Sequence, residues 1–138
     1  MQIIFVCTGN AARSQMAEGW ARHLAPELAV ESGGTQPAGL SRRAVAAMAE
    51  AGVDISAQRS KPLSATARCD ADIAVTLCGS AQEECVALPW SPTTQREHWP
   101  IADPVAAPAG GDPLAPFHAA RDEIRARVEA LLANIENR

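Results

Sequence analysis

Apolar residues along the chain are concentrated in short runs that are typical of strands. These runs lie at residues 2–6, 28–34 and 71–78, with a shorter one within 96–104. The first run, QIIFV, is rich in β-branched residues, and the second ends at two glycines. The pattern therefore predicts four short strands.

Apolar residues with helical spacing occupy three other parts of the chain. They predict helices at residues 14–25, 41–52 and 116–138. Ser41 and Gly52 are residue types that begin and end a helix, which supports the second span. The last helix has the clearest apolar stripe, formed by Phe117, Ile124, Val128, Leu131 and Ile135.

Strands that alternate with helices predict a parallel sheet with helices on both faces. The 138 residues have the usual size of one domain, and 47% of them are hydrophobic, enough for a core without disulfides. The loop-like stretch at 104–116 is short enough to lie within that domain. We therefore predict an α/β fold: one three-layer domain, residues 1–138, with a four-stranded parallel sheet flanked by helices.

Charge and composition limit where the protein acts and what it binds. The net charge is −4 and the acidic residues are scattered, which argues against nucleic acid or a membrane as partner. No apolar run approaches the roughly 20 residues that span a bilayer, and the N-terminus lacks the basic start of a signal peptide. We therefore expect a cytoplasmic protein with reduced thiols. We also expect a monomer. In such a protein, cysteines indicate catalysis, redox chemistry or a metal site, and the four cysteines are Cys7, Cys69, Cys78 and Cys85.

The stretch FVCTGNAARSQMAEG, residues 5–19, places a cysteine at the end of a predicted strand and an arginine just before a helix. A loop at that position lies at the carboxyl edge of a parallel sheet, where such folds bind ligands. Backbone N–H groups of the loop and of the helix N-terminus can surround an oxyanion, and small side chains let it approach closely. The expected oxyanion site comprises Thr8, Gly9, Asn10, Ala11, Ala12, Arg13 and Ser14.

Cys7 lies at the base of this expected site. The helix N-terminus and Arg13 both favour the thiolate, which is the nucleophilic form of cysteine. Arg13 can hold two oxygens of a phosphate-like group, and Ser14 can donate a hydrogen bond to the sulfur. The loop lacks the lysine of nucleotide-binding P-loops, so we reject that motif. In the alternative interpretation, Cys7 is a buried strand-end thiol and Arg13 a surface residue.

Other residues also have both a chemical and a structural interpretation. Asp103 precedes a proline that holds it extended, so it is either a general acid or the start of a turn. Cys78 ends a predicted strand at the same sheet edge as Cys7, and Cys85 follows it, so the two are either redox partners or packing and loop residues. The absence of a Cys-x-x-Cys pair argues against zinc. We expect no metal and no cofactor, and Cys69 has no assigned role.

The loop VCTGNAARSQMAEG resembles the active-site loop of the low-molecular-weight protein tyrosine phosphatase superfamily, which includes arsenate reductases. The resemblance implies the fold of that superfamily. It gives Cys7 the role of nucleophile, Arg13 that of oxyanion ligand and Asn10 that of a brace within the loop. It also makes Asp103 the general acid, because the family carries this acid in an Asp-Pro loop near the C-terminal helix.

The arrangement VTLCGSAQEECVALP is similar to the thioredoxin-coupled arsenate reductases. The segments GVDISAQRSKPL, REHWPIADP and FHAARDEIRARVEALL extend the resemblance over nearly the whole chain. It implies that Cys7 attacks arsenate, that Cys78 releases arsenite and leaves a Cys7–Cys78 disulfide, and that Cys85 then exchanges with it. Thioredoxin is the implied reductant, and phosphate or sulfate are further anions for the site.

Some members of this family hold a potassium ion near the loop with an asparagine, a glutamate, a serine and an aspartate. Asn10, Glu18 and Ser32 correspond to the first three of these residues. Lys61 stands in place of the aspartate and supplies a positive charge itself. We therefore predict that this chain has no potassium site.

Two other functions remain open. A phosphotyrosine phosphatase of the same superfamily shares the loop and the Asp-Pro, but typically carries aromatic residues after it. Here DPVAAPAGG follows and the chain has no tyrosine, which leaves little to stack on a phenyl ring. A non-catalytic module would bind oxyanions even without its thiols.

Overall fold

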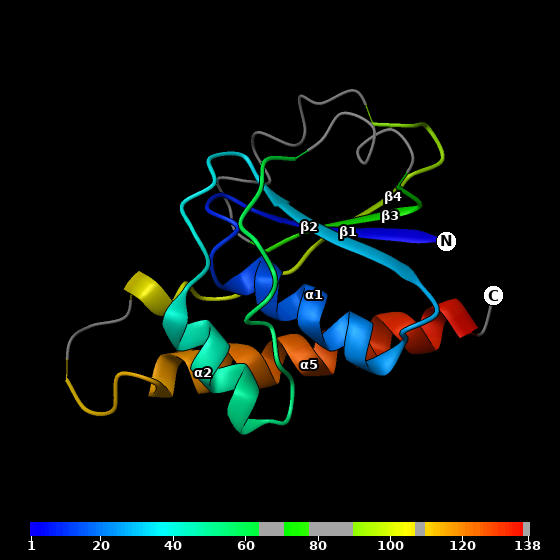
Figure 1. Cartoon of the computed structure of the whole chain (residues 1–138). Helices are drawn as coiled ribbons and strands as arrows, with labels where there is room; N and C mark the ends of the chain where they lie inside the picture. The colour runs from blue at the N-terminus through cyan, green and yellow to red at the C-terminus, as the bar shows by residue number, and fades with distance from the viewer. Residues whose placement is uncertain (64–70, 78–89, 107–109, 137–138) are drawn as a thin grey trace.

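The computed structural model describes the chain except at residues 64–70, 78–89, 107–109 and 137–138 (Figure 1). In the described residues the sheet has parallel strands in the order β2-β1-β3-β4. The strands are β1 (Gln2–Cys7), β2 (Ala29–Gly34), β3 (Ile73–Thr76) and β4 (Gln95–His98). The four predicted strands are confirmed. β4 ends before Pro100, which has no backbone N–H to continue a ladder.

The α-helices of the described residues match the predicted spans. They are α1 (Arg13–Leu24), α2 (Arg42–Glu50) and α5 (Ala115–Glu136), and a short 3-10 helix, η1 (Pro104–Ala106), begins the predicted loop. Ser41 caps α2, because its side chain accepts a hydrogen bond from Ala44 N at 3.3 Å. Gly52 follows that helix with φ of 84°, which glycine adopts without strain. None of these helices is long and apolar enough to cross a membrane.

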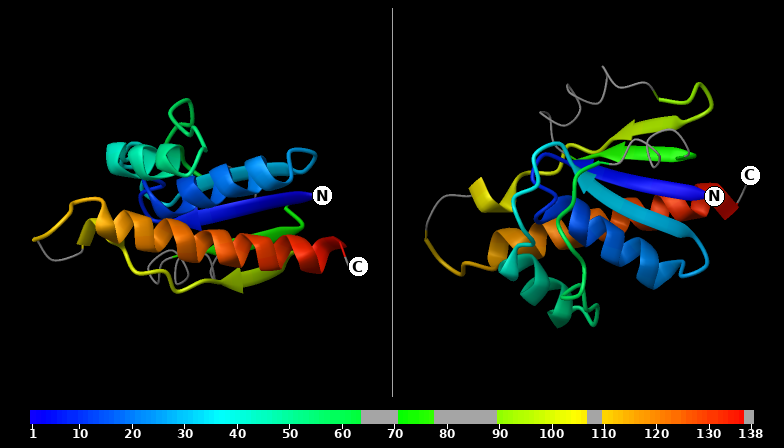
Figure 2. Two further views of the ribbon diagram at one scale, coloured as in Figure 1. Left: turned by 90° about the horizontal axis from the view of Figure 1, so that it is seen from below. Right: turned by 45° about the horizontal axis from the view of Figure 1, so that its top comes forward.

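The described helices pack on one another and on one face of the sheet (Figure 1, Figure 2). Ile3 and Phe5 of β1 belong to that core, whereas Ile4 and Val6 alternate with them on the opposite face. The predicted parallel sheet flanked by helices is confirmed. In the part of the chain that the structure describes, the second face carries no helix, so its cover stays a prediction.

The carboxyl ends of the parallel strands share one edge of the sheet, and Cys7 ends the inner strand β1 there. The strand register pairs Cys7 with Gly34 of β2. A Cβ atom on Gly34 would lie 2.7 Å from Thr8 O and 2.9 Å from Asn10 Cβ, so only glycine lets β2 approach the loop this closely.

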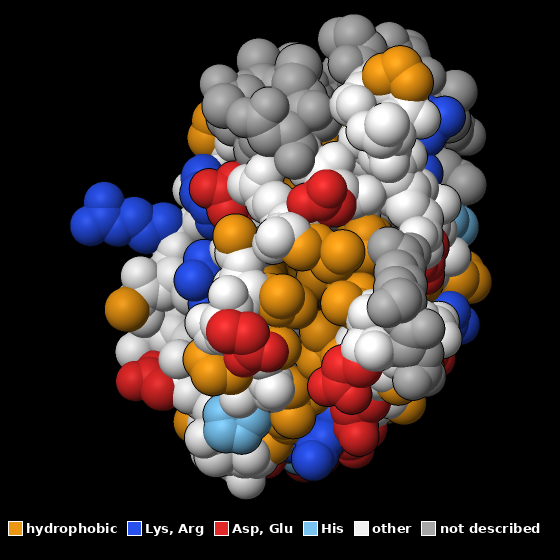
Figure 3. Space-filling model, turned by 90° about the vertical axis from the view of Figure 1, so that its right-hand side faces the viewer, with side chains coloured by type: hydrophobic (Ala, Val, Ile, Leu, Met, Phe, Trp, Pro, Cys, Tyr) orange, Lys and Arg blue, Asp and Glu red, His pale blue; other side chains and the backbone are white. Residues whose placement is uncertain are grey.

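At the other end of the molecule, near the amino ends of the strands, hydrophobic side chains gather in the centre of the surface (Figure 3).

Candidate active site

The loop between β1 and α1 has its carbonyl groups turned outward. Donors from residues 36–41 hold three of them: Gln36 N donates to Thr8 O at 2.8 Å, and Ala38 N to Gly9 O and Ser41 N to Ala11 O at 2.9 Å. The N–H of a trans peptide points away from its carbonyl, so the N–H groups of Gly9, Asn10 and Ala12 point the other way, into the loop. Converging N–H groups of this kind attract an anion.

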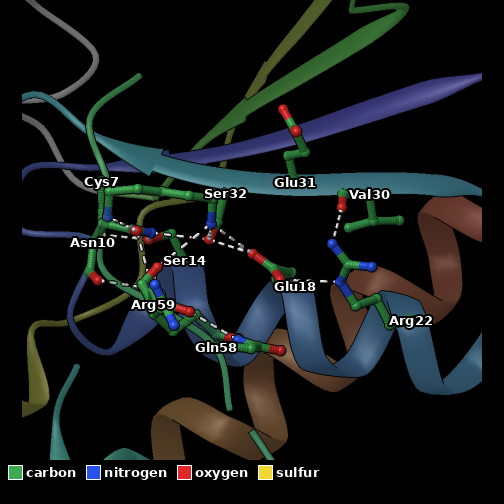
Figure 4. Close-up of polar contacts among 12 residues, drawn as sticks. Cys7, Asn10, Ser14, Glu18, Arg22, Val30, Glu31, Ser32, Gln58 and Arg59 are labelled. Atoms are coloured by element: carbon green, nitrogen blue, oxygen red, sulfur yellow. Dashed lines mark hydrogen bonds and ion pairs between the residues drawn. The ribbon is translucent and has the colours of Figure 1, made fainter. Parts of the chain in front are cut away.

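Asn10 fixes the middle of the loop (Figure 4). It is buried and has φ of 45°, in the left-handed region that asparagine tolerates better than most residues. Its side-chain amide donates to Ser14 Oγ at 2.8 Å and to Ser32 Oγ at 3.0 Å. Its side-chain oxygen accepts from Gln15 Nε2 at 2.9 Å and from Lys61 N at 3.0 Å. All four hydrogen-bonding positions of the amide are used, which makes Asn10 a rigid brace.

Cys7 is buried and its sulfur contacts Ser14. The distance between Cys7 Sγ and Ser14 Oγ is 2.8 Å, so the predicted contact is confirmed. Because Ser14 Oγ accepts from the Asn10 amide, its own hydrogen is available for the sulfur.

Arg13, the first residue of α1, is held by backbone groups at the same sheet edge. Its Nη1 donates to Ile101 O at 3.0 Å and to Leu77 O at 3.3 Å. Its Nη2 lies 3.7 Å from Asp103 Oδ2. Nε has no hydrogen bond among the residues that the structure describes. The Nε–Nη2 edge of the guanidinium is therefore the one that can bind an oxyanion with two parallel hydrogen bonds.

Asp103 lies at the mouth of this site, with 42% of its side chain exposed against 14% for Arg13. Its Oδ1 accepts a hydrogen bond from Val105 N at 3.0 Å, which closes the turn at the start of η1. Oδ2 is the oxygen that faces Arg13. The structure thus brings Asp103 and Arg13 together and fits the turn interpretation and the acid interpretation at once.

Glu18 is a buried carboxylate with two cationic partners next to the loop (Figure 4). Its side chain is 5% exposed, and Oε1 accepts from the Ser32 hydroxyl and from Lys61 Nζ at 3.3 Å. Oε2 accepts from Arg22 Nε at 3.0 Å. The ammonium of Lys61 lies where we expected it. We had not assigned Arg22, although its position four residues after Glu18 on a helix is a signal for an ion pair.

The contacts of Lys61 with Glu18 and Ser32 are the basis of the prediction that the chain has no potassium site. Lys61 Nζ already neutralises Glu18 and lies 3.4 Å from Ser32 Oγ, so a second cation there would meet like charge. Replacing sodium chloride by potassium chloride at constant ionic strength should therefore leave the melting temperature and any activity unchanged. A rise with potassium alone would show that the ion displaces the ammonium.

The remaining sequence predictions have different outcomes. Cys69, Cys78 and Cys85 lie outside the described residues, so their roles stay predictions.

Sequence reasoning missed the residues that hold the loop from outside, namely 36–41 and the segment 58–61. In the second segment, Ser60 Oγ donates to Gly9 O at 3.0 Å. Only the resemblance in GVDISAQRSKPL pointed to that segment, and it assigned no role beyond Lys61.

The sequence of the chain matches a known family. The family "Low molecular weight phosphotyrosine protein phosphatase" matches residues 2–138, and the chain belongs to that family. An arsenate reductase of Bacillus licheniformis is 46% identical to it over 129 residues, which cover 92% of this chain and 91% of that protein. An arsenate reductase of Bacillus subtilis is 45% identical over 129 residues, with the same coverage.

Solved structures show the same architecture. "An arsenate reductase in the phosphate binding state" superposes with a TM-score of 0.80 at 37% identity, covering 97% of this chain and 98% of that one. A thioredoxin-dependent arsenate reductase of Corynebacterium glutamicum superposes with a TM-score of 0.77 at 25% identity. The superposition covers 98% of this chain and 61% of the Corynebacterium chain, which is therefore longer.

Proposed function

We propose that this chain is an arsenate reductase that converts arsenate to arsenite. The observation that carries the proposal is a buried thiol beside a loop whose carbonyls face outward: Cys7 Sγ lies 2.8 Å from Ser14 Oγ, and donors from residues 36–41 hold three of the loop carbonyls. Relatives at 45% and 46% identity named arsenate reductase support it, as does the related structure in a phosphate-binding state. We also propose that the protein is a cytoplasmic monomer of one domain, residues 1–138.

In the first step, the Cys7 thiolate attacks the arsenic atom of an arsenate held by the loop. An As–S bond forms, one As–O bond breaks, and Asp103 gives a proton to the departing oxygen, which leaves as water. The loop N–H groups and Arg13 stabilise the charge on the remaining oxygens. The product of this step is an arsenate ester of the Cys7 sulfur.

Reduction uses Cys78 and Cys85, whose roles follow from the resemblance. The Cys78 thiolate attacks Cys7 Sγ, an S–S bond forms, and the arsenic leaves as arsenite with the electron pair of the broken As–S bond. Cys85 then attacks Cys78 Sγ, which frees Cys7 and leaves a Cys78–Cys85 disulfide. We propose thioredoxin as the reductant of that disulfide, a choice supported by the thioredoxin-dependent relative.

The test of this proposal is arsenate-dependent oxidation of NADPH in the presence of thioredoxin and thioredoxin reductase. The parent protein should turn over. Cys78→Ser and Cys85→Ser should lose steady-state reduction but keep hydrolysis of p-nitrophenyl phosphate, which needs only the loop and Cys7. Absence of turnover by the parent would reject the reductase, and unchanged reduction by Cys85→Ser would reject the exchange step.

Asp103→Asn tests the general acid. The amide keeps the shape of the side chain and the oxygen that accepts from Val105 N, but it has no proton to give. The kcat for arsenate reduction should therefore fall by about 10²-fold or more, with little change in the KM for arsenate. Asp112→Asn is a matched control, because Asp112 also precedes a proline and accepts from the N–H two residues later, at 2.9 Å. Equal losses in both variants would show that Asp103 acts only in its turn.

A second candidate function is hydrolysis of small phosphate esters. The same loop and nucleophile serve that reaction, because phosphate and arsenate are both tetrahedral oxyanions. Val105, two residues after the acid in the sequence, is 65% exposed and aliphatic. An aliphatic residue offers less contact to a phenyl ring than an aromatic one, so we expect weak activity on small esters and poor activity on phosphotyrosine peptides.

A further inference from the structure

Gln15, in the first turn of α1, is a buried amide that joins the loop to residues 58–59. It is 0% exposed. Its Nε2 donates to Asn10 O at 3.0 Å, to Asn10 Oδ1 at 2.9 Å and to Arg59 O at 2.9 Å. Two hydrogens serve these three acceptors, so one of them is shared. Its Oε1 accepts from Gln58 Nε2 at 2.7 Å, so both ends of the amide are satisfied.

These bonds determine which way the peptide between Asn10 and Ala11 faces. The carbonyls of Thr8, Gly9 and Ala11 are held by donors from residues 36–41. The carbonyl of Asn10 is held by the Gln15 side chain. Asn10, which precedes this peptide bond, has φ of 45°, in the left-handed region. With its carbonyl held outward, the Ala11 N–H points into the oxyanion site.

Gln58 fixes the orientation of the Gln15 amide. Its Nε2 donates to Gln15 Oε1 and also to Gln15 O at 3.0 Å. If the Gln15 amide turned over, its oxygen would face Asn10 O, Asn10 Oδ1 and Arg59 O, which are all acceptors. Its nitrogen would then face the donor of Gln58. The hydrogen bonds therefore allow only one of the two orientations.

We propose that Gln15 is a positioning residue that orients the Ala11 N–H for oxyanion binding, and that Gln58 holds Gln15 in place. For arsenate this inference rests on the proposed function. Inorganic phosphate is a probe of the same loop that needs no reduction step. Its binding therefore tests the inference even if the chain reduces no arsenate.

The test uses Gln15→Met, which keeps the length and burial of the side chain but removes its donors. Without them the Asn10 peptide can turn, and one hydrogen bond to the anion is lost, so the Kd for phosphate measured by calorimetry should rise about tenfold or more. The KM for p-nitrophenyl phosphate should rise by a similar factor, and kcat should fall less. Gln2→Met, at the far end of β1, is the matched control and should bind phosphate like the parent.

A purely structural role predicts a different result. Gln15→Met would then lower the melting temperature and the active fraction, and so the apparent kcat, while the Kd for phosphate of the folded protein stayed at the parent value. Gln58→Met covers the case in which Gln15→Met fails to fold, because it changes a half-buried residue and leaves the donors of Gln15 in place. It should raise the Kd by a smaller factor. Parent-like phosphate binding in Gln58→Met, and in Gln15→Met where that variant folds, would overturn the proposal.

Discussion

Replacing Cys7 by serine is expected to abolish arsenate reduction and ester hydrolysis while phosphate still binds. The hydroxyl fits the space of the thiol, so the outward-turned carbonyls and the N–H groups of the loop keep their positions. A serine hydroxyl at this site is not ionised, and the side-chain hydrogen bond that the described residues show for residue 7, to the Ser14 hydroxyl at 2.8 Å, supplies no base to activate it. Activity should therefore fall by about 10⁴-fold or more in both assays.

Cys69→Ser is the matched control for this variant, because it makes the same exchange at a cysteine to which we assign no role. It should keep the parent rates. Reduction that survives in Cys7→Ser would place the nucleophile elsewhere. If neither the parent nor the variant turns over and both bind phosphate alike, the chain is a non-catalytic oxyanion-binding module.

The second large effect is expected from Arg13→Lys. Lysine keeps the positive charge but lacks the planar fork that binds Leu77 O and Ile101 O with one nitrogen and presents Nε and Nη2 to an anion. Loss of two charge-assisted hydrogen bonds, each about 1.5–3 kcal/mol, corresponds to a decrease of about 10²- to 10⁴-fold in kcat/KM. The Kd for phosphate should rise in the same variant, because these bonds are also made to a bound ground-state anion.

Arg127→Lys on α5 is the control for this charge-conserving exchange, since its contact with Glu123 is 4.0 Å long and both side chains are exposed. It should leave kcat/KM unchanged. A kcat/KM of Arg13→Lys within a few-fold of the parent value would show that charge alone, without the fork, is sufficient. In that case the carbonyl contacts of Arg13 would only stabilise the fold, and the melting temperature would fall without loss of activity.

The sequence predicted the features that depend on neighbours along the chain. The apolar pattern located β1, β2 and the helices α1, α2 and α5, because a buried face requires regular spacing whatever the rest of the fold does. Cys7 and Ser14 could be expected to touch because a strand, a short loop and a helix follow one another directly. Ser41 could be recognised as a cap because capping joins it to Ala44, only three residues away.

By itself, the sequence thus determined the class of fold, the oxyanion loop and the position of its thiol. Only the tertiary structure decided how that loop is held, by residues 36–41 and 58–61 and by the Gln15 amide. It also decided that Arg13 binds carbonyls 64 and 88 residues further along the chain. Most of these partners are backbone N–H and C=O groups, which nearly every residue carries. Such groups leave no signal in the order of side chains, so only the folded arrangement shows which of them meet.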